Sequence, residues 1–418
     1  MAGQYIPFTS PGNGTKGVLY GPESGTPSHV AILAMHRTSN LLWRGEEWAR
    51  RGYLHLCMNP RFDNNEASVR WEEIALDVGM GVDFLRRQPG ITKVVLQGGS
   101  GGGPTMTFYQ AVAEQGPAYA QHPSRLICCP ADLNGLTPAD GVILVDAHPG
   151  NPANGLRSLN PAVVDEARPN LLDPELNPFS PNNGYNELGN STYPEAFKAR
   201  YFTAQAERMN RMIASALEKK HAIDRGKGTC PDDDLFLVPR GQGARLRQLD
   251  VSIHHSSVEP RQVLKNDGSI VVEIAASVRK ANPGLRELNA TFGQPAGEEG
   301  GARLLTVLSF LSANATRSSH ALDGIDWDST NNSTMGAVRS ISVPLLVTTM
   351  GAHYFIRDNE LIYEAAASAD KDFIMIEGAT HVGAPAVACE AFPGQYGNAN
   401  TNRHDYMQRW IESRFPAP

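Results

Sequence analysis

The sequence predicts an α/β protein whose mostly parallel sheet is covered by helices on both faces. Short apolar runs alternate with segments of helical periodicity from about residue 18 to 150, and again from about 343 to 415. The runs are continuously apolar, as in strands that are buried on both faces. At 418 residues the chain is long enough for a large core and a second lobe.

The first half of the predicted sheet follows from local patterns. Apolar runs predict strands, and apolar positions at helical spacing predict helices. Ser68 is a plausible N-cap for the first long helix, and Pro104 suits the first turn of the next one. The expected order is strand 29–36, strand 53–60, helix 68–88, strand 93–97, helix 104–116 and strand 141–150.

The alternation stops between about residues 151 and 340. This stretch is rich in Asn, Pro, Gly and Ser, and it contains one long helical segment and a few strand-like pieces. We interpret it as a cap inserted into a core domain that is formed by residues 1–150 and 341–418. The core then resumes with strand 343–350, helix 358–368, strand 372–378 and helix 404–415.

Composition excludes several classes of protein. The net charge is −7 with no block of like charges, which argues against nucleic-acid and anionic-membrane partners. The N-terminal residues lack a signal-peptide pattern, and the five cysteines match no zinc spacing, so we expect reduced thiols and a cytoplasmic protein. We expect neither cofactor nor metal. The oligomeric state stays open, with a homodimer as one option.

One glycine-rich segment carries the first chemical signal. Residues 98–102 read Gly-Gly-Ser-Gly-Gly, which fits G-x-S-x-G, between a predicted strand and a predicted helix. In that context Ser100 projects above the carboxyl end of the sheet as a nucleophile. A phosphate loop is excluded because no Gly-Lys-Ser/Thr follows, and a dinucleotide fingerprint normally follows the first strand.

A nucleophilic serine needs a base near neutral pH. His381 lies in the loop after the last predicted strand, which ends at the same sheet edge as Ser100. We therefore predict that His381 is the base.

At this point the chain resembles the α/β-hydrolase superfamily. The resemblance rests on the residues around Ser100, on Gly-Ala-Thr-His ending at His381, and on residues 34–40 after an early strand. It implies an eight-stranded, mostly parallel sheet with a cap after the sixth strand, and a Ser-His-acid triad. It also implies an oxyanion hole made by the Gly101 N–H and by the loop at His36–Arg37. Arg37 stands where family members often have glycine, which leaves the second donor open, and the His36 side chain is either structural or functional.

The acid has three candidates. Many family members have the acid shortly after the seventh strand, where this chain has Tyr354, and the carboxylates Asp358 and Glu360 come later, at the start of the next predicted helix. Asp358 also suits a helix N-cap. A subset of the superfamily takes its acid from the end of the sixth strand, which is Asp146 here. We predict Asp146, with Asp358 or Glu360 as the alternative.

The predicted reaction is hydrolysis of a carboxylic ester or lactone through an acyl-enzyme. The size of the cap suggests a small-molecule substrate that is bulkier than a short-chain ester. A peptidase, a carbon–carbon bond hydrolase or an acyltransferase on the same scaffold is the alternative, followed by a non-catalytic binding protein. Several aromatic residues of the cap either line a pocket or form the core of the cap. They are Tyr185, Tyr193, Phe197, Tyr201 and Phe202.

Overall fold

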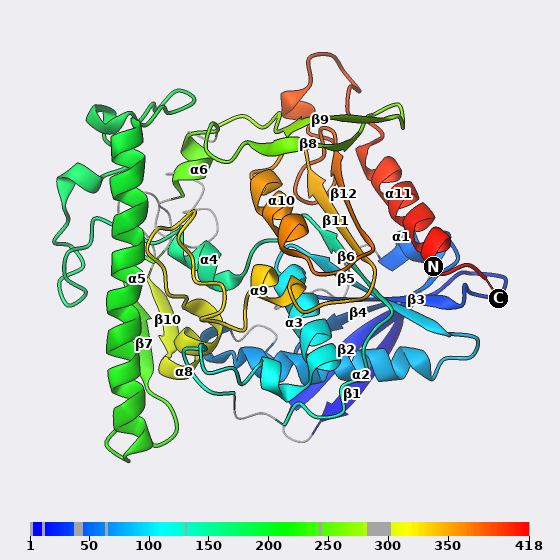
Figure 1. Cartoon of the computed structure of the whole chain (residues 1–418), viewed down its shortest axis with the longest axis horizontal. Coiled ribbons are helices and arrows are strands. Elements are labelled where there is room, and N and C mark those ends of the chain that lie inside the picture. Colours follow the sequence, from blue (N-terminus) through cyan, green and yellow to red (C-terminus); the bar gives the residue numbers. More distant parts are fainter. Residues whose placement is uncertain are drawn as a thin grey trace.

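A ten-stranded sheet forms the centre of the molecule (Figure 1). The computed structural model describes residues 3–10, 13–36, 45–62, 66–129, 132–241, 245–281 and 302–417. The strand order is β1-β2-β4-β3-β5-β6-β11-β12-β8-β9, and the six pairs from β4 to β8 are parallel. The strands are β1 (Gln4–Ser10), β2 (Asn13–Tyr20), β3 (Val30–Met35), β4 (Leu54–Asn59), β5 (Lys93–Gly99), β6 (Gly141–Val145), β8 (Ser256–Leu264), β9 (Ile270–Ala276), β11 (Leu345–Met350) and β12 (Lys371–Ile376).

Helices cover both faces of this sheet. Alternate residues of β3 face opposite sides: Leu33 packs in the cluster that contains Phe108 of α3, and Ile32 packs in the cluster that contains Trp410 of α11. A continuous apolar strand is what two covered faces require. The helices are α1 (Gly45–Arg50), α2 (Ile74–Arg86), α3 (Gly102–Gln115), α4 (Asn151–Leu156), α5 (Glu195–Asp224), α6 (Leu246–Leu249), α8 (Val307–Ser309), α9 (Thr334–Val338), α10 (Ile356–Ala365) and α11 (Ala399–Arg414).

The predicted fold class is confirmed, and this topology is an α/β-hydrolase fold. The sheet, however, has ten strands where we expected eight. The two additional strands are the antiparallel hairpin β8–β9, which arises within residues 151–340 and pairs with β12. This hairpin extends the core sheet, so not all of the predicted insertion lies apart from that sheet. The division of the chain near residues 150 and 340 otherwise stays a prediction.

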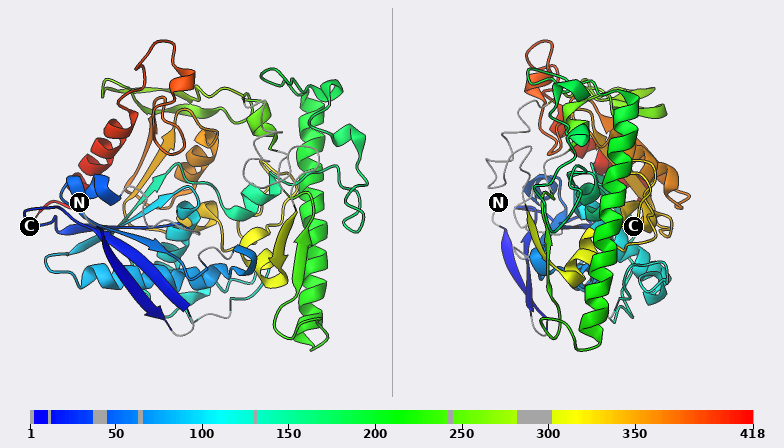
Figure 2. Two further views of the ribbon diagram at one scale, coloured as in Figure 1. Left: turned by 180° about the vertical axis from the view of Figure 1, so that it is seen from behind. Right: turned by 90° about the vertical axis from the view of Figure 1, so that its left-hand side faces the viewer.

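The rest of the inserted segment has a core of its own. A separate hydrophobic cluster joins α5, α6, α8 and the small sheet that β7 (Leu235–Val238) forms with β10 (Arg303–Thr306). The 30-residue helix α5 runs along one side of the molecule, with α11 on the opposite side (Figure 2). All five cap aromatics named above are buried members of this cluster, which identifies them as packing residues.

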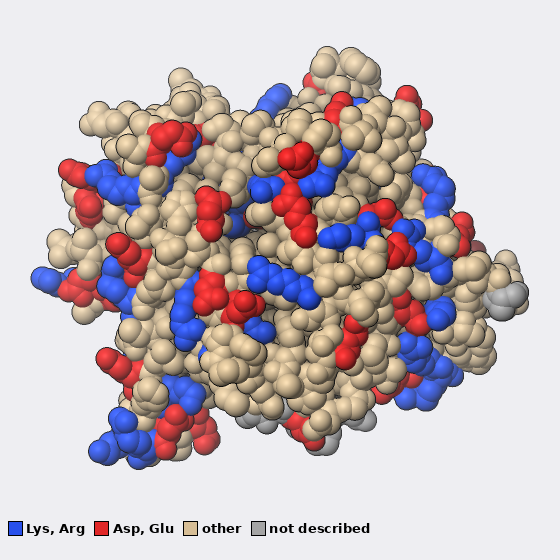
Figure 3. Space-filling view, viewed as in Figure 1, with Lys and Arg blue, Asp and Glu red and all other residues tan. Residues whose placement is uncertain are grey.

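Lys and Arg are interspersed with Asp and Glu over the face seen in Figure 3. Among the residues that the structure describes, no helix combines the length and the apolarity that crossing a membrane requires.

Candidate active site

The turn after β5 places Ser100 at the carboxyl edge of the sheet. Ser100 has a φ of 51°, a left-handed conformation that is rare for residues other than glycine. The turn is also tightly packed, since a Cβ on Gly98 would lie 2.6 Å from the Gly102 carbonyl oxygen. Helix α3 begins at Gly102, so its N-terminal N–H groups lie next to the serine. The strand-turn-helix context that G-x-S-x-G requires is therefore present.

The register of the sheet brings Asp146 beside this turn. Gly99 of β5 pairs with Val145 of β6, so the two residues that follow them, Ser100 and Asp146, leave the sheet side by side. The Ser100 N–H donates to the Val145 carbonyl at 3.1 Å. Asp146 also turns sharply, with a φ of 46°. Two adjacent left-handed turns thus direct both side chains above the same edge.

His381 connects the two side chains. It follows β12 and accepts a hydrogen bond at Nε2 from the Ser100 hydroxyl, with 2.9 Å between the atoms. Its Nδ1–H donates to Asp146 Oδ2 at 2.6 Å, in the tautomer that these two partners select. The three residues predicted from the sequence therefore form one hydrogen-bonded chain, whereas neither alternative acid takes part in it.

Asp146 is held as an anion. Its side chain is completely buried, and Oδ1 accepts hydrogen bonds from the Thr349 hydroxyl and the Met350 N–H at 3.2 Å each. Burial alone would raise the pKa of this carboxyl, but His353 and His381 outweigh burial and hold the pKa below its usual value. The carboxylate can therefore orient His381 and stabilise its protonated form.

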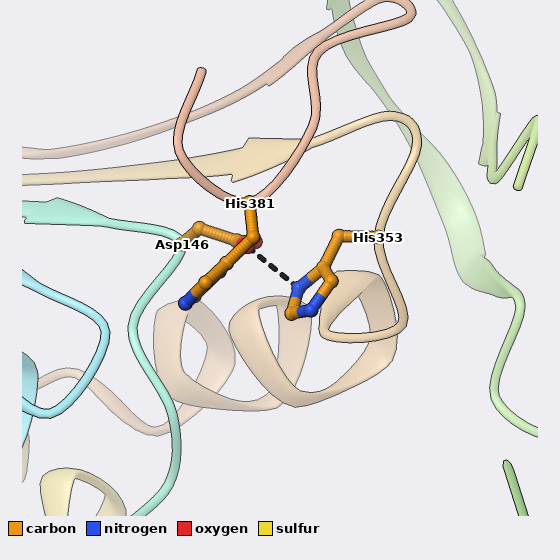
Figure 4. Close-up of side chains that lie close together, drawn as sticks. All are labelled: Asp146, His353 and His381. Carbon is orange, nitrogen blue, oxygen red and sulfur yellow. Dashed lines mark hydrogen bonds and ion pairs between the residues drawn. The ribbon is translucent and has the colours of Figure 1, made fainter. Parts of the chain in front are cut away.

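A second imidazole, which we did not predict, reaches the same carboxylate. His353 Nδ1 lies 2.7 Å from Asp146 Oδ2, at ion-pair distance but without the angles of a hydrogen bond. His353 comes from the loop after β11, and His381 comes from the loop after β12 (Figure 4). The two rings stack with centroids 4.2 Å apart. Burial lowers the pKa of His353, and Asp146 offsets part of that effect, so the ring is neutral at neutral pH.

These three side chains also have the composition of a metal site. Their ligand atoms lie within 4.8 Å of one another. Ligands of a tetrahedral ion with bonds of about 2.0 Å stand about 3.3 Å apart. The separations of 2.6 and 2.7 Å between the nitrogens and Oδ2 are shorter than that, and the one from His381 is a hydrogen bond. The geometry therefore favours proton transfer over metal binding.

The predicted oxyanion donor already has an acceptor. The Gly101 N–H donates to His36 Nε2, with 3.1 Å between the nitrogens. The His36 side chain thus occupies the position that we expected for a substrate oxygen. Arg37, the other predicted member of the hole, lies outside the described residues.

His148 is a further imidazole at this point that the sequence analysis missed. Its backbone N–H donates to the Ser100 carbonyl at 3.2 Å, and its Nδ1 accepts from the Gly150 N–H at 3.1 Å. The second contact puts the ring proton on Nε2 in the neutral form. A Cβ on Gly101 would lie 3.1 Å from that nitrogen. The signal available in the sequence was its position, two residues after Asp146.

Asp358 and Glu360 serve the structure instead. Asp358 binds Arg157 Nη1 at 3.0 Å and Arg247 Nη1 at 2.8 Å, and all three side chains are buried. It lies inside α10 and is not the N-cap that we considered. Glu360 accepts from the Val258 N–H at 2.8 Å and so ties α10 to the hairpin β8–β9.

A cavity of about 500 Å³ opens above Ser100 and His381. One wall belongs to the core and includes Tyr354, the residue at the usual position of the acid. The rest of the lining comes from residues within the predicted insertion. These are Asn151, Asn154, Gly155, Ser158, Gly241, Arg245 and Arg303.

Comparisons with known proteins add only distant likenesses. No protein-family model matches the chain, and no curated protein matches it. Among solved structures, the α/β hydrolase GrgF from Penicillium sp. sh18 is 11% identical with a TM-score of 0.47, over all of both chains. DcsB in complex with its substrate analogue is 12% identical with a TM-score of 0.48, also over all of both chains. A soluble variant of monoglyceride lipase from Saccharomyces cerevisiae is 11% identical with a TM-score of 0.44, over 99% of this chain and 96% of the lipase. These values are low, so we take the fold from the topology of the chain and the chemistry from its site.

Proposed function

We propose that this protein is a serine hydrolase that cleaves a carboxylic ester or lactone of a fairly bulky small molecule. One observation carries the proposal: the hydrogen-bonded chain from Ser100 through His381 to Asp146 opens into a cavity of about 500 Å³. This volume falls in the range of small-molecule sites.

In the proposed mechanism Ser100 Oγ attacks the acyl carbon while His381 Nε2 takes the hydroxyl proton. The ionised Asp146 stabilises the imidazolium that forms. His381 then protonates the departing alcohol oxygen, which leaves an acyl-enzyme on Ser100. Water, activated by the same imidazole, releases the acid and restores the serine.

The developing oxyanion requires donors at Gly101 and His148. An anionic oxygen is a stronger acceptor than a neutral imidazole nitrogen, so we propose that it displaces His36 from the Gly101 N–H. The His148 Nε2–H supplies the second donor. Removal of one such donor typically lowers kcat by about 100- to 1,000-fold.

The inserted segment sets the size of the substrate in this proposal, because it forms one wall of the cavity. Substitutions in that wall, for example Asn154→Trp, are expected to shift preference toward smaller esters. They should leave the reaction of Ser100 with a small phosphonylating reagent largely intact.

A panel of aryl esters, lactones, amides and carbon–carbon substrates, assayed with purified protein and with Ser100→Ala, tests the proposal. We expect turnover of esters or lactones in water without an acyl acceptor, and loss of that turnover in Ser100→Ala. Hydrolysis of amides or carbon–carbon bonds alone would favour the alternative activities. Turnover that survives Ser100→Ala would refute the nucleophile.

A further inference from the structure

We propose that the substrate carries an anionic group, a carboxylate or a phosphate, which Arg245 and Arg303 bind in the cavity above Ser100. This inference rests on the proposed ester hydrolysis and adds the class of ester. It follows from the arginines that line the cavity and from those that lie next to Tyr354 in that lining.

The first observation is the composition of the lining. Arg245 and Arg303 both face the cavity that Ser100 and His381 occupy. Among the described residues that line it, none is Asp or Glu, and the others are neutral side chains, glycines and three histidines. Two guanidinium groups in one concave site are what a bound anion requires.

Each of the two guanidinium groups donates a hydrogen bond to a neutral side chain. Arg245 Nε donates to the Ser158 hydroxyl at 2.9 Å, and that hydroxyl donates in turn to the Asn154 carbonyl at 2.7 Å. Arg303 Nη2 donates to Asn314 Oδ1 at 2.7 Å. Each contact fixes the orientation of a guanidinium without removing its positive charge, and a planar fork can then bind a carboxylate or phosphate through two parallel hydrogen bonds.

A second layer of positive charge lies behind Tyr354. The guanidinium carbons of Arg247 and Arg279 stand 5.2 and 5.9 Å from the centre of its ring. Arg247 shares Asp358 with Arg157, whereas Arg279 donates to backbone carbonyls, among them that of Arg247 at 2.7 Å. Among the described residues, Asp358 is the carboxylate that binds Arg157 and Arg247 directly, while Asp250 acts on Arg279 from a greater distance.

Arg279 keeps its charge despite its burial. Burial, together with the charge of Arg247, lowers the pKa of Arg279 to about 10. The group stays protonated at neutral pH, so the positive charge remains. A chain with a net charge of −7 thus places two arginines in the lining of this cavity and two more against Tyr354.

The test compares two esters of similar length in purified protein. One is the para-nitrophenyl hemiester of glutaric acid, which carries a carboxylate, and the other is para-nitrophenyl valerate, which ends in a methyl group. We expect the wild-type kcat/KM for the hemiester to exceed that for the valerate by about tenfold or more, the effect of one hydrogen bond to a charged group. Arg245→Gln and Arg303→Gln should each lower this ratio about tenfold, mainly through KM.

Three controls make the result specific. Arg168→Gln removes the same charge from an exposed arginine that pairs with Asp165 and does not line the cavity, and it should keep the wild-type ratio. Arg245→Lys retains the charge and should retain part of the preference. Free glutarate and inorganic phosphate, tested as inhibitors of valerate hydrolysis, distinguish the two kinds of anion by which one inhibits more strongly.

The outcomes separate this inference from the proposed function. Equal kcat/KM for the two esters, or a ratio that the Arg245 and Arg303 variants leave unchanged, would overturn the anion site. Absence of inhibition by both anions would do the same. If neither ester is hydrolysed and a fluorophosphonate leaves Ser100 unmodified, the hydrolase itself is refuted. If Ser100 is modified and valerate is hydrolysed, the proposed hydrolase is supported, and the kcat/KM ratio tests the anion site alone.

Discussion

Two buried aspartates, Asp146 and Asp358, look alike in every general property. Both are almost completely excluded from solvent, and both have a pKa held below the usual value despite burial. Each carboxylate lies against two nitrogen-bearing side chains. Burial, charge and pKa alone therefore do not tell which of the two belongs to an active site.

The partners make the difference. Asp358 is bound by Arg157 and Arg247, and even with its pKa lowered to about 10 by burial, Arg157 keeps its proton at neutral pH. Asp146 is bound by two imidazoles, and the imidazole of His381 also contacts the Ser100 hydroxyl, where it can take up and return a proton. The first arrangement can only hold the inserted segment to α10, whereas the second can support proton transfer to and from Ser100. The role of a buried carboxylate is therefore inferred from whether its neighbours can gain and lose a proton.

The largest effect is expected for Asp146→Asn. The amide keeps the shape of the side chain but favours the wrong tautomer of His381, so kcat for an ester should fall by about 10,000-fold. Thermal unfolding should change little by comparison. Steady-state kinetics and a melting curve check both parts. Activity within tenfold of the wild type would contradict the role of Asp146.

Asp358→Asn should show the opposite pattern. Two buried guanidinium groups would lose the carboxylate that they share, which costs about 3–5 kcal/mol of unfolding free energy. Where the variant is folded, kcat should stay within about tenfold of the wild type, because Asp358 does not contact the Ser100–His381 chain. Urea denaturation and ester assays measure the two effects.

Asp358→Glu keeps the comparison testable if the asparagine variant does not fold. It retains the charge at the cluster and should recover part of the lost stability. A variant at this position that unfolds normally but loses catalysis would reverse the assignment of the two aspartates.

A decrease in pH tests the stabilising role of Asp358, with an effect of intermediate size. Because the folded-state pKa of Asp358 is lowered, its stabilisation is fully present above about pH 4 and is lost as the pH falls further. The difference in unfolding free energy between wild type and Asp358→Asn should therefore be constant from about pH 8 to 5 and shrink below about pH 4. A difference that already shrinks near neutral pH would contradict this account.

His55 contributes a separate loss of stability at low pH in the same experiment. Burial lowers the pKa of the His55 imidazole to about 3. Below about pH 6.5 this imidazole therefore takes up a proton in the unfolded chain but not in the folded chain. Stability should then decrease by up to about 1.4 kcal/mol per pH unit in wild type and Asp358→Asn alike. His55→Gln should remove this part of the loss, whereas His254, whose pKa burial also lowers to about 3, keeps its own part.

The smallest effect is expected for His353→Gln. His353 acts through Asp146, and so it is a positioning residue whose loss should lower kcat/KM by about tenfold. Asp146 would then interact with one imidazole instead of two, and the acid limb of the pH–rate profile should move to higher pH. A loss of activity without any movement of that limb would indicate a purely structural role.

Local patterns were sufficient to predict much of the fold and the chain of residues at the site. Ser100, Asp146 and His381 each follow an apolar run, and parallel strands bring such positions to one edge. The long helix α5 has a periodic pattern that needs no partner to be recognised. In these cases the sequence around a residue contains what determines its position.

The remaining features depend on pairings across the chain. Nothing near Asp358 reveals Arg157, 201 residues away, and the N-cap interpretation therefore failed. The same holds for the pairing of β8 with β12 and for the contact of His353 with Asp146. The hydrogen bond from the Gly101 N–H to His36 joins residues 65 positions apart. It gives the predicted oxyanion donor a side chain as its acceptor. Local periodicity does not encode such contacts.

The central claim is that Ser100 is a nucleophile activated by His381 and Asp146. Its most direct test is incubation with a fluorophosphonate, followed by intact-mass measurement and peptide mapping. The account predicts one adduct per chain, located on Ser100, formed rapidly in wild type, much more slowly in Asp146→Asn, and not at all in Ser100→Ala. An adduct on another residue, or a Ser100 that reacts no faster in wild type than in Asp146→Asn, would contradict it.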